Sequence, residues 1–96
     1  MRSVDSSNVY KRLYRLLGRR GWNLSLLDPL IVKLASDVDP RTLFKDHPLK
    51  GRFKGLRDCH VTSINDDWVL VYEKIGTDRL FLHATGTHRD CGLEKD

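Results

Sequence analysis

The residues best suited to acid and base chemistry lie between positions 47 and 91, a stretch that holds all four histidines of the chain. His47 opens a basic run, His60 ends a segment of strand composition, and His88 follows another. Histidine suits proton transfer because its ordinary pKa, about 6.5, lies near neutral pH. Asp67 adds a carboxylate that can act as a base or orient an imidazole. Metal-free cleavage of RNA needs such groups, a base for the ribose 2′-hydroxyl and an acid for the leaving 5′-oxygen.

Groups that could hold RNA lie in the same stretch. The basic run, broken by two glycines, consists of Lys50, Arg52, Lys54 and Arg57. Lysine and arginine bind phosphates, and arginine does so with two parallel hydrogen bonds. Trp68 or Tyr72 could stack on an unpaired base, as in many proteins that bind single-stranded RNA. Because adjacent strands lie about 4.8 Å apart, neighbouring strand ends could bring these groups to one phosphate.

The same residues also fit ordinary structural roles. A single histidine is more often a surface residue or a hydrogen-bonded polar residue than a catalyst. Trp68, at the start of a strand, is typical of a core residue. Asp66 and Asp67 belong to a stretch of turn composition. On residue types alone, the prediction stops at a basic α+β domain that could be a ribonuclease.

Two cysteines, Cys59 and Cys91, are too few for a disulfide framework, so we expect reduced thiols and a cytoplasmic protein. Together with His60 and His88 they could form a zinc site that stabilises the domain. Standard zinc signatures, however, space their ligands in two clear pairs, which this chain lacks. We therefore expect no metal and no other cofactor.

Length and charge favour a single domain with an anionic partner. Ninety-six residues suit one domain, which we assign to residues 1–96. Seventeen lysines and arginines against thirteen acidic residues leave a net charge of +4, which favours nucleic acid or an acidic protein as partner. No apolar run approaches the roughly 20 residues needed to span a membrane, and the N-terminus has no signal-peptide core. We expect no membrane association.

The first half of the chain predicts two helices. Ser7, or the serine before it, can cap a first helix, which Gly18 or Gly21 would end. In the second helix, Asp28 would be the N-cap and Pro29 the first helical residue. If the helix instead begins near Asn23, Pro29 would kink it. The basic side chains of the first helix are typical of a solvated face, with docking of RNA or an acidic partner as the alternative.

The second half predicts strands, because β-branched and aromatic residues become frequent there. A linker over residues 38–46 would tuck Leu43 and Phe44 under the sheet. Helices first and strands later favour an α+β fold, in which two helices pack on one face of a small, mainly antiparallel sheet. The expected strands are a short edge strand within residues 2–6, then Phe53–Val61, Trp68–Ile75 and Arg79–Thr85.

Three segments, KDHPLKGRFKGLRDCH, DDWVLVYEK and LFLHATGTH, closely resemble the YafQ branch of the RelE-type toxin family. The resemblance covers roughly residues 45–91, and it implies a RelE-like fold. It also implies the toxin of a type II toxin–antitoxin system, an enzyme that cleaves translated mRNA on the ribosome without a metal and leaves a 2′,3′-cyclic phosphate. The implied partners are the ribosome, mRNA and an acidic antitoxin of the RelB or DinJ type, with which the toxin forms a hetero-oligomer.

Matched residue by residue, the resemblance implies individual roles. His47 matches the histidine of the HPL motif, and His60 matches the histidine that ends the first long strand. Asp67 and Trp68 match the family's D-W pair, and His88 matches the histidine of TGTH. His88 is the implied general acid for the leaving oxygen. Asp67, with His60 or His47, would activate the 2′-hydroxyl.

Ala84 is the most consequential departure from the family pattern. The family typically has an arginine at this position, before TGTH, where it would stabilise the charge of the phosphorane. His83 is adjacent, but strand alternation predicts that it points to the opposite face. The link after His60 is also longer than usual, and the aromatic residue usual after TGTH is absent. A catalytically silent module that binds RNA or a partner on the same fold is therefore the alternative.

Overall fold

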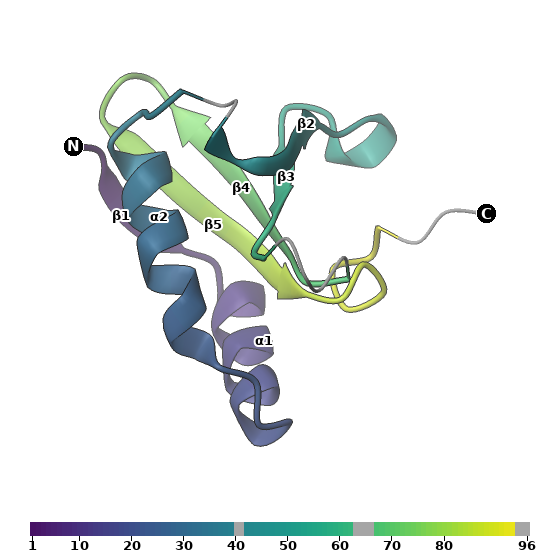
Figure 1. The fold of residues 1–96 in the computed structure, drawn as a ribbon. Coiled ribbons are helices and arrows are strands. Elements are labelled where there is room, and N and C mark those ends of the chain that lie inside the picture. Colours follow the sequence, from purple (N-terminus) through teal and green to yellow (C-terminus); the bar gives the residue numbers. More distant parts are fainter. Residues whose placement is uncertain (40–41, 63–66, 94–96) are drawn as a thin grey trace.

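The computed structural model describes residues 1–39, 42–62 and 67–93 of the chain, and it confirms the predicted α+β fold. Two helices pack against a five-stranded sheet (Figure 1). The helices are α1 (Asn8–Arg19) and α2 (Leu27–Ala35). The strands are β1 (Ser3–Ser6), β2 (Phe44–Pro48), β3 (Arg57–His60), β4 (Val69–Ile75) and β5 (Arg79–Gly86). Among the described residues, no helix is long and apolar enough to cross a membrane.

The sheet has the strand order β1-β5-β4-β3-β2. β2, β3, β4 and β5 pair antiparallel along the chain, as expected for segments joined by short connections. β1 pairs with β5 in parallel, so the sheet is mixed. The weakly signalled edge strand near the N-terminus is therefore confirmed.

Helix α1 begins at the predicted cap. The hydroxyl of Ser7 accepts the backbone N–H of Tyr10 at 2.9 Å. The same hydroxyl donates to the carbonyl of His83 at 2.7 Å, which fixes the start of α1 to β5. An N-cap side chain of this kind stabilises a helix by about 1 kcal/mol.

Helix α2 begins at Leu27, two residues earlier than predicted, so the assignment of Asp28 as its N-cap is wrong. A 3₁₀ turn at Leu24–Leu26 leads directly into the helix. Asn23 caps that turn by accepting the N–H of Ser25 at 3.3 Å. Asp28 lies in the first turn of α2, where its negative charge is favourable next to the helix N-terminus.

The apolar core forms two clusters. In the first, α1 and α2 pack against side chains that include Leu70, Tyr72 and Leu82. In the second, Leu13 of α1 packs with Val69, Val71, Ala84 and Cys91. Because side chains alternate along a strand, neighbours such as Leu70 and Val71 belong to opposite faces of the sheet. The second cluster therefore marks the face that carries Asp58, which pairs with Val71 across β3 and β4.

The predicted strand Phe53–Val61 is too long, and β2 was not predicted. A 3₁₀ turn occupies Gly51–Phe53, so β3 begins only at Arg57. β2 was assigned to the linker because its sequence, FKDHP, contains a single large apolar residue. That residue, Phe44, lies on an edge strand with 44% of its surface exposed, and the expectation that it tucks under the sheet is wrong. Leu43 is partly buried against the first cluster, as expected.

A β-bulge in β5 changes which face its residues present. Val71 pairs with Ala84 and Tyr72 pairs with Leu82, so His83 is the extra residue. The ring of His83 packs on that of Phe81 at 4.8 Å between centroids. Phe81 directly precedes Leu82 and points to the opposite face, which is the face that Ala84 shares with Val71. The prediction that strict alternation separates His83 from Ala84 is therefore wrong.

Candidate active site

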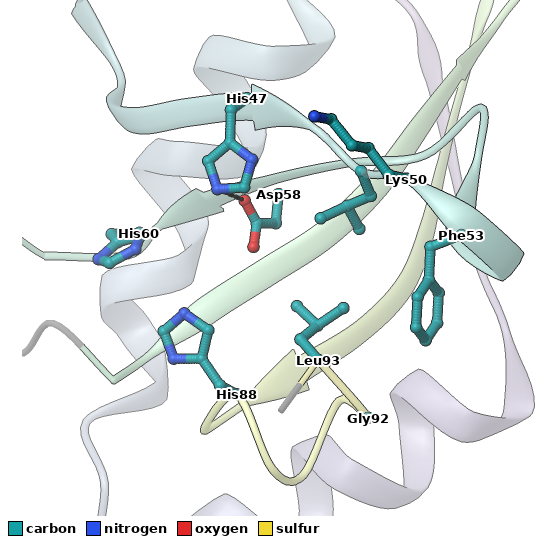
Figure 2. Close-up of a pocket in the computed structure, with 9 residues that line it drawn as sticks. His47, Lys50, Phe53, Asp58, His60, His88, Gly92 and Leu93 are labelled. Carbon is teal, nitrogen blue, oxygen red and sulfur yellow. Dashed lines mark ion pairs between the residues drawn. The ribbon is translucent and has the colours of Figure 1, made fainter. Parts of the chain in front are cut away.

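A pocket of about 470 Å³ lies over the face of the sheet that carries Asp58. Its three histidines and one aspartate come from three parts of the chain and surround the pocket (Figure 2). They are His47 from β2, Asp58 and His60 from β3, and His88 from the loop after β5. Lys50, from the loop after β2, also lines the pocket. Leu49, Phe53 and Leu93 form much of the apolar wall. The structure thus brings together the three histidines that the sequence singled out.

The pairing register of β2 and β3 places His47 next to Asp58 at the pocket. His47 pairs directly with Asp58 across the two strands. Asp58 and His60 are two residues apart on β3 and therefore face the same side. The row of pairs continues through Val71 to Ala84, so Ala84 lies on the same face two strands away from Asp58.

Asp58 is a site residue that the sequence interpretation overlooked. Its side chain is only 2% exposed, and one carboxylate oxygen, Oδ1, lies 2.7 Å from Nε2 of His47. Burial raises the pKa of the Asp58 carboxyl, while the neighbouring side chains of His47, His60 and His88 oppose that rise. Three histidines therefore surround one buried carboxyl. The signal that could have found it is its position two residues before His60, which strand alternation places on the same face.

Replacing Asp58 with asparagine should stabilise the fold at neutral pH while lowering any activity of the site. The raised pKa means that the folded protein holds this proton more tightly than the unfolded chain. The contribution of Asp58 to stability therefore falls as pH rises above the ordinary carboxyl value of about 3.9. Asparagine has the same shape and never ionises. Thermal unfolding of both proteins from pH 3 to pH 8 checks this.

The gain in melting temperature from Asp58→Asn should shrink as pH falls, because the aspartate becomes protonated in both the folded and the unfolded state. Asp5→Asn is the matched control, since that carboxylate is 56% exposed on β1, away from the pocket. A lower melting temperature for Asp58→Asn at neutral pH would mean that its ion pair with His47 outweighs the cost of burial.

His88 is oriented by Asp67. The carboxylate oxygen Oδ1 of Asp67 lies 2.7 Å from the ring Nδ1 of His88 and accepts the His88 backbone N–H at 3.0 Å. Because it accepts both bonds, the pKa of the Asp67 carboxyl is lowered. This contact engages Nδ1 and leaves Nε2 as the ring nitrogen for proton transfer. Asp67 was expected to work with His60 or His47, and the structure shows it bound to His88. Its neighbour Asp66 lies outside the described residues.

His60 and His88 face each other in the pocket. Their ring centroids are 5.6 Å apart, and the rings meet edge to face. His60 is 7% exposed and lines the pocket together with His88. Two imidazoles this close together can both contact one phosphodiester in the pocket.

The basic run divides between the pocket and other surfaces. Lys50 lines the pocket, as a phosphate-holding residue should. The guanidinium of Arg52 lies 4.9 Å from the centre of the Phe53 ring, at the apolar end of the pocket. Lys54 is exposed on the turn before β3.

Arg57 does not line the pocket, so the expectation that it contacts the same phosphate as the histidines is not met. It pairs with Tyr72 across β3 and β4 and therefore shares the helix-covered face. Its guanidinium donates to the carboxylate of Asp46 at 3.1 Å, and the Asp46 side chain is only 3% exposed. The physical reason is alternation, since Arg57 directly precedes Asp58 and the two must point to opposite sides.

Tyr72 and Trp68 are core residues, and neither can serve as a platform for a base. Tyr72 is 1% exposed, and its hydroxyl donates to Oδ1 of Asp46 at 2.5 Å. Trp68 is 4% exposed, and its indole N–H donates to the hydroxyl of Thr85 at 3.1 Å. The ring of Trp68 also packs on Trp22 at 5.0 Å between centroids. The core alternative for Trp68 is therefore the correct one.

Ala84 lies 7% exposed among the apolar side chains of the second cluster. Leu49 and Leu93 pack against that cluster and also line the pocket. The position of the expected arginine is thus next to the pocket, but the side chain present there carries no charge.

The two cysteines cannot share a metal with the histidines. Cys59 packs in the first cluster and Cys91 in the second, on opposite faces of the sheet. Burial raises the pKa of each thiol to about 12, which disfavours the thiolate that zinc binds. Across residues 1–39, 42–62 and 67–93, no group of three or more potential ligands is arranged to hold a metal ion.

Comparison with known proteins places the chain among the toxins of bacterial type II toxin–antitoxin systems. The family model for the YafQ toxin, described as the bacterial toxin of a type II toxin–antitoxin system, matches residues 2–92. The chain therefore belongs to the YafQ toxin family. It is 36% identical over 89 residues to the mRNA interferase toxin YafQ of Escherichia coli K12, with 91% of each chain covered.

Solved structures of similar proteins share the fold. YafQ from E. coli BL21(DE3) has a TM-score of 0.79 at 30% identity, with 93% of this chain and 96% of that chain covered. A chain of the E. coli DinJ–YafQ toxin–antitoxin complex has a TM-score of 0.76 at 34% identity, covering 92% and 93%. A metal-bound toxin from Helicobacter pylori has a TM-score of 0.81 at 33% identity, covering 94% and 98%.

Proposed function

We propose that this chain is an endoribonuclease that cleaves mRNA during translation on the ribosome, by acid and base catalysis without a metal. The observation that carries the proposal is the facing pair of His60 and His88, with Asp67 behind His88 and the buried Asp58 between the histidines. The E. coli relatives, which are named mRNA interferase toxins, support the same class of reaction.

The chemistry follows from which ring nitrogens are engaged. His47 is oriented by Asp58, so its role is to hold positive charge next to the phosphate. His60 takes the proton of the 2′-hydroxyl, whose oxygen attacks the adjacent phosphorus. His88 donates its Nε2 proton to the leaving 5′-oxygen. The products are a 2′,3′-cyclic phosphate and a free 5′-hydroxyl.

Phosphate binding is assigned to the cations at the pocket. Lys50, which lines the pocket, would contact the phosphate, and Arg52, next to Phe53, would contact the flanking backbone. Lys54, exposed on the turn before β3, would also contact the flanking backbone. Lysine and arginine side chains at such positions strengthen RNA binding independently of sequence.

The proposed protein partners follow from charge and from the relatives. The net charge of +4 favours both ribosomal RNA and an acidic antitoxin. Because the E. coli relative forms a complex with DinJ, we infer a hetero-oligomer with an antitoxin of that type. The site of action would be the cytoplasm, where mRNA is translated.

A second function, binding without cleavage, is favoured by one observation. Ala84 supplies no cation on the pocket face, where the family's arginine would stabilise the phosphorane. A protein with this pocket could still bind the ribosome or an antitoxin while cutting slowly or not at all.

Primer extension on an mRNA that is being translated tests the proposal. We expect discrete cuts in the presence of ribosomes and none on the same RNA without ribosomes. Protein that has been treated with EDTA and then freed of the chelator should cut equally well in the ribosome reaction. A 2′,3′-cyclic phosphate should be found at the new 3′ end. Cosedimentation with ribosomes but no cuts at any protein concentration would support binding without cleavage instead.

A further inference from the structure

The loop that carries His88 is held by an aspartate two residues further along. The carboxylate oxygen Oδ2 of Asp90 accepts the backbone N–H of Thr87 at 3.0 Å. In return, the N–H of Asp90 donates to the hydroxyl of Thr87 at 3.0 Å. These reciprocal bonds close a turn around His88, whose own N–H and ring are bound to Asp67.

Gly86 shows how tightly this turn packs. Gly86 has φ 141°, and a Cβ atom there would lie 2.8 Å from Oδ2 of Asp90 and 2.9 Å from its Cβ. Such distances are too short for any side chain at position 86. The glycine of the TGTH motif is therefore required for Asp90 to occupy its observed position.

Arg20 fixes Asp90 from outside the loop. Nη1 of Arg20 donates to Oδ2 of Asp90 at 2.7 Å, and Nη2 donates to Oδ1 at 3.2 Å. The Asp90 side chain is 14% exposed, so this bidentate ion pair is better shielded from water than most surface ion pairs. The hydrogen bond from Arg20 is the main reason that the pKa of the Asp90 carboxyl is lowered.

We propose that Arg20 and Asp90 are positioning residues for His88. The end of α1 clamps the loop through this pair, and the clamp sets the direction of the His88 ring and its contact with Asp67. From the sequence, Arg20 was interpreted as part of a solvated face or of a docking surface, because nothing in the spacing of residues 20 and 90 indicates contact. The kinetic part of this inference rests on the proposed function, while its structural part does not.

Amide hydrogen exchange in the Arg20→Met variant tests the clamp independently of activity. Methionine keeps a stem of similar length but cannot hold the carboxylate. Exchange at the amides of Thr87 and His88 should become about 10-fold faster, while that of Val71 in the sheet stays unchanged. Arg19→Met is the matched control, because Arg19 is exposed at the end of the same helix and makes no ion pair with the described residues.

Cleavage kinetics and a double-mutant cycle complete the test. Arg20→Met and Asp90→Asn should each lower kcat about 10-fold with little change in KM, because a misdirected acid slows the chemical step. The double variant should lose no more than either single variant, since both remove one contact. Arg20→Lys, which keeps the charge, should recover part of the loss.

The exchange and cleavage results together distinguish the clamp from a general effect on folding and from a failure of the proposed function. Unchanged exchange at Thr87 and His88 in Arg20→Met overturns the inference, whatever the cleavage rate. Equally faster exchange throughout β4 also overturns it, because Arg20 would then only hold the fold together. Faster exchange confined to the loop supports the clamp. If that occurs while no variant cleaves RNA, the clamp stands and the proposed function fails.

Discussion

Replacing His88 with alanine should lower the rate of RNA cleavage by about 10²- to 10⁴-fold, the usual contribution of a positioned acid or base. His88 is the one pocket histidine whose Nδ1 is bound by a carboxylate outside the pocket, at 2.7 Å, so its Nε2 is set to protonate the leaving oxygen. Its side chain is 38% exposed, so its removal leaves no buried group without a partner, and the fold should persist. The cleavage rate of a ribosome-bound mRNA at saturating protein is the measurement.

His83→Ala is the matched control for this experiment. His83 lies on β5 five residues before His88, and its Nε2 contacts Glu73 at 3.0 Å instead of lining the pocket. Cleavage by the His83 variant should stay within about 2-fold of the unmodified chain. Growth arrest on induction should follow the same pattern, lost with His88→Ala and kept with His83→Ala. Equal arrest by both variants would point to binding, without cleavage, as the cause of toxicity.

Local patterns predicted the elements but not all of their contacts. The apolar spacing and the Ser7 cap located α1, and the β-branched run located β4, because both signals depend on neighbours in sequence. β2 escaped because an edge strand buries little and needs no apolar alternation. Both faces of the sheet are covered at Tyr72 and Trp68, so these two side chains are buried. Residue type alone does not distinguish a buried aromatic side chain from an exposed one that could stack on a base.

The alternation of side chains along a strand could have identified Asp58 as a site residue, and it led to the wrong prediction for His83. Asp58 and His60 are two residues apart on β3 and share a face, so the choice of His60 as a site residue would have been enough to include Asp58 as well. The same rule excludes Arg57 from the pocket, although it belongs to the basic run. The rule then fails at His83, because the bulge in β5 inserts an extra residue that composition does not reveal.

Long-range pairs could not be predicted from spacing at all. Asp67 reaches His88 across 21 positions, and Arg20 reaches Asp90 across 70. Each contact depends on how the elements pack, which the residue types alone leave open. Motif resemblance supplied Asp67 and His88 as site residues, but only the packing shows that they act as one unit.

Ala84→Arg should raise the rate of cleavage by about 10²- to 10³-fold, the amount that a fixed charge commonly contributes to stabilising an oxyanion. Ala84 lies in the same cross-strand row as Val71 and Asp58, two strands and therefore about 10 Å from Asp58. An arginine stem can lie over the apolar surface of Val71 while its guanidinium reaches the pocket. The rate on a ribosome-bound mRNA, compared with that of the unmodified chain, is the measurement.

The new guanidinium should also change Asp58. Burial without a nearby arginine raises the pKa of this carboxyl, and a positive charge on the same face should lower it again. Carboxyl carbon chemical shifts of Asp58, followed against pH in both proteins, report this directly. A lowered pKa would show that the guanidinium has entered the pocket, independently of any effect on cleavage.

Size and charge are separated by Ala84→Met, which adds a stem of similar length without a cation. Because Ala84 is only 7% exposed, both variants should lose about 1–3 kcal/mol of stability through overpacking. Only the arginine should accelerate cleavage, since only it can hold the phosphorane. If the arginine variant folds, binds ribosomes and lowers the pKa of Asp58 but cuts no faster, then charge at position 84 does not limit this chain. The rate would then be set by the histidines and by how firmly the Asp90 turn holds His88.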